Sequence, residues 1–133
     1  MGGVLIVLDT CALIWWSIDP DKLSQAATEA CKQMETDKNG IVPSTAIWEI
    51  AIKIKNKKLD LGVDLNEHVA SLKKSSVVSI VPINEDLCLE SVKLEWEHRD
   101  PVDRVVVALA RINQASIITA DKQIRNFYPN VIW

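Results

Sequence analysis

Short apolar runs alternate along the chain with longer segments that have an amphipathic helical pattern. The runs at 4–8, 77–83 and 117–118 are rich in Val and Ile and predict strands. The continuous apolar run at 4–8 is typical of a strand buried on both faces of a parallel sheet. Two further strands are predicted at 41–43 and 131–133. Pro43 suits the end of a strand rather than its middle.

Helices are predicted between these strands. The clearest follows Asp100, an expected N-cap, and Pro101, which suits the first helical position. Further helices are predicted at 12–18, 23–34, 44–54 (with Ser44 or Thr45 as its N-cap), 65–74, 85–95 and 122–126. The regular alternation predicts an α/β fold in which helices flank a mostly parallel central sheet, with one domain spanning residues 1–133.

Composition narrows the class of protein. The chain has 133 residues and a formal net charge of −3, which does not favour a protein that coats nucleic acid, so RNA binding would need a local patch or a metal ion. Cys11, Cys31 and Cys88 are odd in number and form no C-x-x-C motif, which argues against a disulfide framework and fits a reducing cytoplasm. The histidines, His68 and His98, are expected to be surface or partly packed residues. Because no segment approaches the roughly 20 apolar residues of a membrane span, we expect a soluble cytoplasmic protein.

Four carboxylates stand out by position. Asp9 and Asp121 each follow a predicted strand, while Asp103 and Glu49 are expected in the first turns of helices. Asp103 could also serve the helix dipole and Glu49 could pair with Lys53, whereas no structural role is predicted for Asp121. Parallel strands would bring all four carboxylates to one edge of the sheet. A hard cation such as Mg²⁺ or Mn²⁺ relieves such repulsion, and a site of this kind suits phosphodiester hydrolysis.

The same carboxylates lie in four segments that resemble one known family. In order, these segments are LDTCALIWW, STAIWEIAIKIKNKKLDL, WEHRDPVDRVVVALA and IITAD. Together they resemble the PIN-domain ribonucleases, in particular the VapC-like toxins of toxin–antitoxin pairs. The resemblance implies a PIN-like fold and metal-dependent cleavage of RNA with one or two Mg²⁺ or Mn²⁺ ions. It also implies a homodimer and inhibition by a small cognate antitoxin protein.

The resemblance assigns roles residue by residue. It implies a catalytic and metal-binding set made of Asp9, Glu49, Asp103 and Asp121. Residues that would assist this set are Asp100, Thr10 and Thr119. Residues that would hold the RNA backbone are Lys53, Arg99 and Arg104, for which solvated helix charges are the alternative interpretation.

Other classes of protein fit less well. A Mg²⁺-dependent phosphoryl-transfer domain of the receiver type would pair two acids at the first strand, where only Asp9 stands. A phosphatase of the haloacid-dehalogenase type would have an aspartate at position 11, which is Cys11. A non-catalytic RNA- or protein-binding module on the same fold usually lacks one of the acids, and all four are present here.

The tryptophans suggest buried or interface positions. Trp48 and Trp96 are expected in the core or in an interface. Trp15 and Trp16 cannot both face inward on one helix, so one of them is expected at a protein contact.

Overall fold

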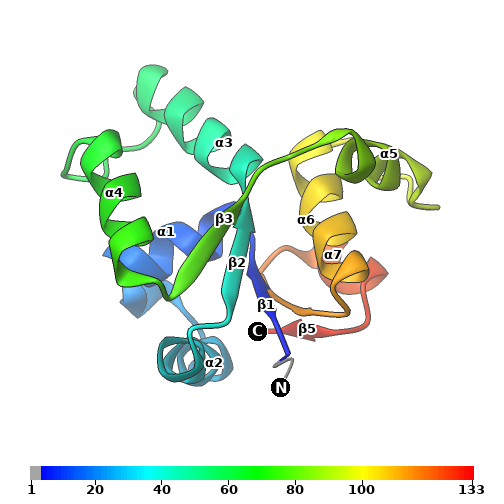
Figure 1. The fold of residues 1–133 in the computed structure, drawn as a ribbon, viewed down its shortest axis with the longest axis horizontal. Coiled ribbons are helices and arrows are strands. Elements are labelled where there is room, and N and C mark those ends of the chain that lie inside the picture. Colours follow the sequence, from blue (N-terminus) through cyan, green and yellow to red (C-terminus); the bar gives the residue numbers. More distant parts are fainter. Residues whose placement is uncertain (1–3) are drawn as a thin grey trace.

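Five strands form one parallel sheet in a computed structural model of the protein, which describes residues 4–133 (Figure 1). Residues 1–3, part of the predicted domain 1–133, lie outside the described residues. The strands are β1 (Ile6–Leu8), β2 (Gly40–Pro43), β3 (Val78–Val81), β4 (Ser116–Ile118) and β5 (Val131–Ile132). Their order is β3-β2-β1-β4-β5, and every neighbouring pair is parallel. The predicted α/β fold with a parallel sheet is confirmed.

Each predicted helix is present, with its ends shifted by a few residues. The helices are α1 (Thr10–Ile18), α2 (Gln25–Asp37), α3 (Ser44–Lys55), α4 (Leu65–Ser75), α5 (Glu85–Lys93), α6 (Pro101–Ile112) and α7 (Lys122–Phe127), with a 3-10 turn η1 (Pro20–Lys22) after α1. The predicted N-cap of α3 is wrong, because Pro43 occupies that position. The Ser44 hydroxyl instead accepts a hydrogen bond from the Ile83 N–H at 3.1 Å. Within residues 4–133, no helix has the length and apolarity that a membrane crossing requires.

The sheet separates two apolar clusters, because alternate residues of a strand point to opposite faces. Figure 1 shows α1, α2 and α4 on one side of the strands and α5, α6 and α7 on the other. The strand residues packed with α1, α2 and α4 are Leu8, Val42 and Ile118. The strand residues packed with α5, α6 and α7 are Val7, Ile41 and Ile117. Both faces of the central strands are therefore buried, as the continuous apolar sequence of β1 predicted.

Gly40 allows α2 and β3 to pack closely against the start of β2. A Cβ atom at this position would lie 2.6 Å from the Met34 sulfur and 2.9 Å from a methyl carbon of Val78. Both neighbours are almost completely buried, so neither side chain has free space into which it could move.

We therefore predict that Gly40→Ala lowers the free energy of unfolding by about 1 to 3 kcal/mol, the usual cost of overpacking a core. Urea denaturation measures the change. In a double-mutant cycle with Met34→Ala, the combined loss should be smaller than the sum of the two single losses, because the second change removes the closer of the two contacts. Strict additivity would contradict this account.

Candidate metal centre

Four carboxylates that are far apart in the sequence line one pocket beside the carboxyl ends of β1 and β4. The pocket has a volume of about 340 Å³. Its acidic residues are Asp9, Glu49, Asp103, Asp121 and Asp100, and its other lining residues include Thr10, Cys11, Trp15 and Lys53. The structure thus brings together the whole predicted acidic set.

Asp9 is the most buried of these carboxylates, with 7% of its surface exposed. One oxygen accepts a hydrogen bond from the Ala12 N–H at 2.8 Å, which caps α1, and the other accepts one from the Thr119 hydroxyl. Thr119 is completely buried, and its oxygen also accepts a hydrogen bond from the Asp121 N–H at 3.0 Å. One threonine therefore holds the two aspartates that follow β1 and β4.

Burial raises the pKa of Asp9 from 3.8 to about 6. This pKa already includes smaller increases from the negative charges of Asp103 and Asp121 and decreases from the hydrogen bonds with Thr119 and Ala12. Burial likewise raises the pKa of Asp103, with further increases from Asp100 and Asp121. Both shifts have the sign expected where carboxylates crowd together away from water.

His98 contacts the acidic set directly. Its Nε2 lies 2.7 Å from Oδ2 of Asp103, and this hydrogen bond opposes the rise in the pKa of Asp103. The imidazole packs against Trp96 with ring centroids 4.8 Å apart, and Trp96 stacks on Phe127 at 4.7 Å. We did not expect His98 near the site from the sequence. Donor atoms of His98, Asp100 and Asp103 all lie within 4.8 Å of one another, so these three side chains could also share a metal ion.

Asp100 and Asp121 have structural roles as helix N-caps. Oδ1 of Asp100 accepts a hydrogen bond from the Val102 N–H at 2.9 Å, in agreement with the predicted cap of α6. Oδ1 of Asp121 accepts hydrogen bonds from the Gln123 N–H at 2.8 Å and the Ile124 N–H at 3.2 Å, which cap α7. The expectation that Asp121 has no structural role is therefore wrong. Within the described chain, Oδ2 of Asp121 accepts no hydrogen bond from the protein, so it remains available to a ligand.

Glu49 and Lys53 reach the pocket from α3 on the opposite side. Glu49 is the sixth residue of this helix, so it lies in the second turn and not in the first turn as predicted. It still lines the pocket, as does Lys53 one turn later on the same face of the helix. Among residues 4–133, no ion pair within 4.0 Å joins Glu49 to Lys53, so neither charge is neutralised by the other through direct contact.

The structure contradicts the expectation that Arg104 holds RNA. Its guanidinium donates hydrogen bonds of 2.6 to 3.2 Å to the carbonyl oxygens of Ser91, Val92, Leu94, Trp96 and His98. These bonds use the donor capacity of an arginine and fix the segment between α5 and α6. Arg99 is exposed and lines a neighbouring pocket beside Glu95 and Glu97, outside the acidic pocket.

The residues of the acidic pocket fit a hard divalent cation. Carboxylate oxygens are the ligands that Mg²⁺ and Mn²⁺ prefer. The Thr10 hydroxyl, which lines the pocket, is buried without a hydrogen-bond partner in the part of the chain that the structure describes. Together with the raised pKa of Asp9, this indicates a site whose polar groups are not fully satisfied by the protein alone.

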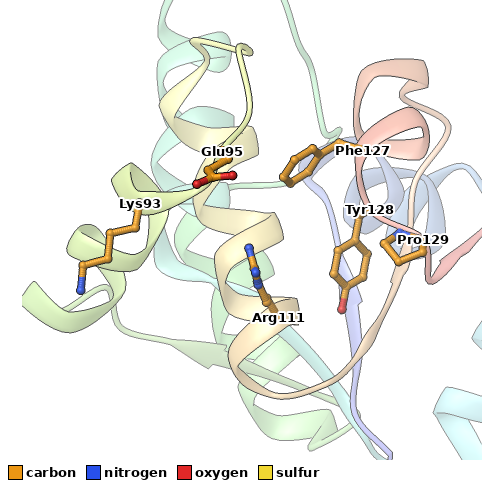
Figure 2. A pocket seen from close by; sticks show the side chains of 6 residues that line it. All are labelled: Lys93, Glu95, Arg111, Phe127, Tyr128 and Pro129. Carbon is orange, nitrogen blue, oxygen red and sulfur yellow. The ribbon is translucent and has the colours of Figure 1, made fainter.

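A larger pocket elsewhere lacks these features. Figure 2 shows this hollow of about 630 Å³ beside α6 and α7. Its lining side chains are Lys93, Glu95, Arg111, Phe127, Tyr128 and Pro129. With one carboxylate and two cationic side chains, it does not resemble a cation site, so we place the candidate chemistry in the smaller acidic pocket.

The hydrogen bonds of Arg104 predict that Arg104→Lys destabilises the protein by about 2 to 4 kcal/mol, because an ammonium group cannot reach five carbonyl oxygens. Chemical denaturation measures the loss. The matched control is Arg99→Lys, because Arg99 is an exposed arginine in the segment that Arg104 contacts, and for this variant we expect a change within about 0.5 kcal/mol. Equal effects of the two substitutions would contradict the structural role of Arg104.

The raised pKa of Asp9 predicts a pH-dependent stability of the metal-free protein. The folded state binds the Asp9 proton more tightly than the unfolded state, so Asp9 destabilises the fold increasingly as the pH rises from about 4 to about 7. Asp9→Asn removes this pH-dependent destabilisation. The unfolding free energy of the variant minus that of the wild type should therefore grow by on the order of 2 to 3 kcal/mol over this range.

Parallel denaturation curves of the two proteins in EDTA measure this difference and cancel the contributions of titrating groups that do not interact with Asp9. Saturating Mg²⁺ should stabilise the wild type at neutral pH and leave the variant nearly unchanged. A difference that stays constant over the whole pH range would show that Asp9 has an ordinary pKa.

Comparisons with known proteins agree with this geometry. A model of the PIN domain matches residues 6–128. Ribonuclease VapC22 of Mycobacterium tuberculosis is 24% identical over 132 residues, which cover 96% of this chain and 98% of that protein. A chain in a solved toxin–antitoxin complex from Klebsiella pneumoniae has a similar fold, with a TM-score of 0.62, 18% identity and 96% of each chain covered. Since the family model spans nearly all of the sequence, this chain belongs to the PIN-domain family.

Proposed function

We propose that this protein is a metal-dependent endoribonuclease that hydrolyses RNA phosphodiester bonds and acts as the toxin of a toxin–antitoxin pair. The observation that carries the proposal is the convergence of Asp9, Glu49, Asp103 and Asp121 in one pocket. The distant similarity to a VapC ribonuclease supports the same reaction class.

The carboxylates would hold one or two Mg²⁺ or Mn²⁺ ions. When bound, such a cation supplies activation of water and stabilisation of charge on the leaving oxygen. Asp9 and Asp121 are kept in place by Thr119 and by the backbone N–H groups that they cap. His98 holds Oδ2 of Asp103 through a hydrogen bond, and Asp103 lines the pocket. Such supporting hydrogen bonds orient metal ligands.

Lys53 provides a cation on the α3 side of the pocket. Its ammonium group would contact a non-bridging oxygen of the scissile phosphate, which places the phosphate between α3 and the aspartates. Glu49, on the same helix, would complete the ligand set from that side.

Protein partners form the second part of the proposal. A small antitoxin would inhibit the protein, as the toxin–antitoxin composition of the Klebsiella complex suggests. We also propose a homodimer. Large apolar side chains are exposed on α3 and α5, where an interface would cover them. These side chains are Trp48, Ile52, Leu89 and Val92. Of the two positions expected for Trp48, its exposure excludes the core, and the interface remains part of this proposal.

The proposal predicts cleavage of a labelled single-stranded RNA by the purified protein in Mg²⁺ or Mn²⁺ and none in excess EDTA. Asp9→Asn and Asp121→Asn should each lower the rate of cleavage by more than about 100-fold. Mutation of a residue that only supports a metal ligand already lowers metal affinity or activity by about 10- to 100-fold, and loss of a ligand itself should cost more. The matched control is Asp64→Asn, because Asp64 also caps a helix but lies outside the pocket.

Equal cleavage by the wild type and by both pocket variants would indicate a contaminating ribonuclease. If the wild type cuts no RNA but binds Mn²⁺ in a manner that Asp9→Asn abolishes, the protein is a binding module and the nuclease proposal is wrong.

A further inference from the structure

A second cavity continues from the acidic pocket toward the end of α3. It has a volume of about 250 Å³. Three lining residues are common to the two cavities, namely Cys11, Trp15 and Lys53. Its remaining walls come from α1, from η1 and from the segment that follows α3. A linear ligand that leaves the acidic pocket on this side therefore enters a preformed channel.

Lysines dominate the charge that this channel offers to a ligand. Lys22, Lys53 and Lys58 line it together with Asp19 and Asp60. The Asp19 carboxylate lies 3.5 Å from Lys22, and the Asp60 carboxylate accepts a hydrogen bond from the Gly62 N–H at 2.8 Å. In the described part of the chain, neither Lys53 nor Lys58 has a carboxylate within 4.0 Å. These two ammonium groups are available to an anion.

Trp15 supplies a flat apolar surface at the junction of the two cavities. Its indole is partly exposed, and its ring packs against Trp133 with centroids 5.7 Å apart. The partner ring restrains the indole, so the exposed part can receive a planar group without a large loss of side-chain freedom. A restrained aromatic ring beside lysines is the combination that binds single-stranded nucleic acid.

The pocket beside His98 differs from this channel in its charge. Trp96 supplies an aromatic ring there, but the charged residues that line this pocket are Glu95, Glu97 and Arg99, and no lysine is among its lining residues. Phosphates would meet a net negative charge there if His98 is neutral. The charge distribution therefore favours one exit for an RNA strand from the acidic pocket, and that exit is the channel between α1 and α3.

We propose that Trp15, Lys53 and Lys58 form a subsite for unpaired RNA next to the scissile phosphate. Trp15 stacks on the base beside the cleaved bond, Lys53 holds the phosphate at the cleavage position, and Lys58 holds the following phosphate in the channel. Stacking on the indole requires a base released from pairing, so the subsite selects single-stranded RNA over duplex. This inference rests on the proposed nuclease function and specifies its substrate.

Fluorescence anisotropy tests the subsite in the protein with Asp9 intact and with Ca²⁺ in place of Mg²⁺, so that a hard cation occupies the carboxylates, and gel analysis of the probe verifies that it stays uncut. The probes are a labelled oligouridylate and an RNA duplex of the same length. We expect Trp15→Leu to weaken binding of the single strand by roughly tenfold or more and to leave the duplex little changed. Trp15→Phe should retain most of the affinity, because it keeps an aromatic face.

Salt dependence tests the lysines separately. Lys53→Gln and Lys58→Gln should each lower the slope of log affinity against log salt concentration by about 0.7, the value for one phosphate contact on a single strand. The matched control is Lys93→Gln in the pocket of Figure 2, which should leave the slope unchanged. In the cleavage assay with Asp9 intact, Trp15→Leu and Lys58→Gln should raise KM for RNA with little change in kcat. Thermal melting verifies that each variant is folded.

Unchanged affinity in Trp15→Leu and in both lysine variants would overturn the subsite while leaving the nuclease proposal intact, provided that the wild type cleaves RNA. A larger effect of Lys93→Gln than of Lys58→Gln would also overturn it and would direct the strand over the α6–α7 face. If the wild type neither cleaves nor binds RNA, both proposals are wrong.

Discussion

The hydrogen bond from the Thr119 hydroxyl to the Asp9 carboxylate ties the carboxyl end of β1 to that of β4. Because Thr119 also accepts the Asp121 N–H, one buried side chain holds both strand-end aspartates. After β1 the chain crosses to β2 on one side of the sheet, and after β4 it crosses to β5 on the other side. The connections that leave these two neighbouring strands therefore run in opposite directions. Open α/β sheets form their ligand sites where connections diverge in this way. The topology therefore opens the pocket, and Thr119 keeps its central carboxylates together.

The fold was predictable because its main determinants are local. Val- and Ile-rich runs identified β1, β3 and β4, and the apolar spacing after Pro101 identified α6. Parallel pairing then implied that residues following the strands would gather at one edge, which placed Asp9 beside Asp121. Element ends were less predictable, since they depend on tertiary contacts. Ser44, for example, is a reasonable N-cap by sequence, but its hydroxyl is bound to the backbone of Ile83, 39 residues away.

The less predictable parts of the candidate site depend on tertiary contacts, which decide the hydrogen-bond and packing partners of each side chain. Arg104 follows an acidic residue and seemed suited to phosphate, yet carbonyl groups of the segment before α6 surround it. His98 reaches Asp103 from the irregular segment that precedes α6, in which Asp100 caps the helix. The packing of α1 places Trp15 at the pocket, where its ring contacts Trp133 from the other end of the chain. The spacing of apolar residues along the sequence does not predict such tertiary contacts.

The charges of the site imply that a metal ion binds before RNA. Backbone N–H groups at the starts of α1, α6 and α7 stabilise Asp9, Asp100 and Asp121, as helix N-termini generally stabilise anions. This stabilisation is incomplete, since burial still raises the pKa of Asp9 to about 6. In a protein of net charge −3, the metal-free pocket repels phosphate as strongly as it attracts a cation. A divalent ion must therefore neutralise the carboxylates before lysines on one flank suffice to hold RNA, and RNA affinity becomes linked to occupancy of the metal site.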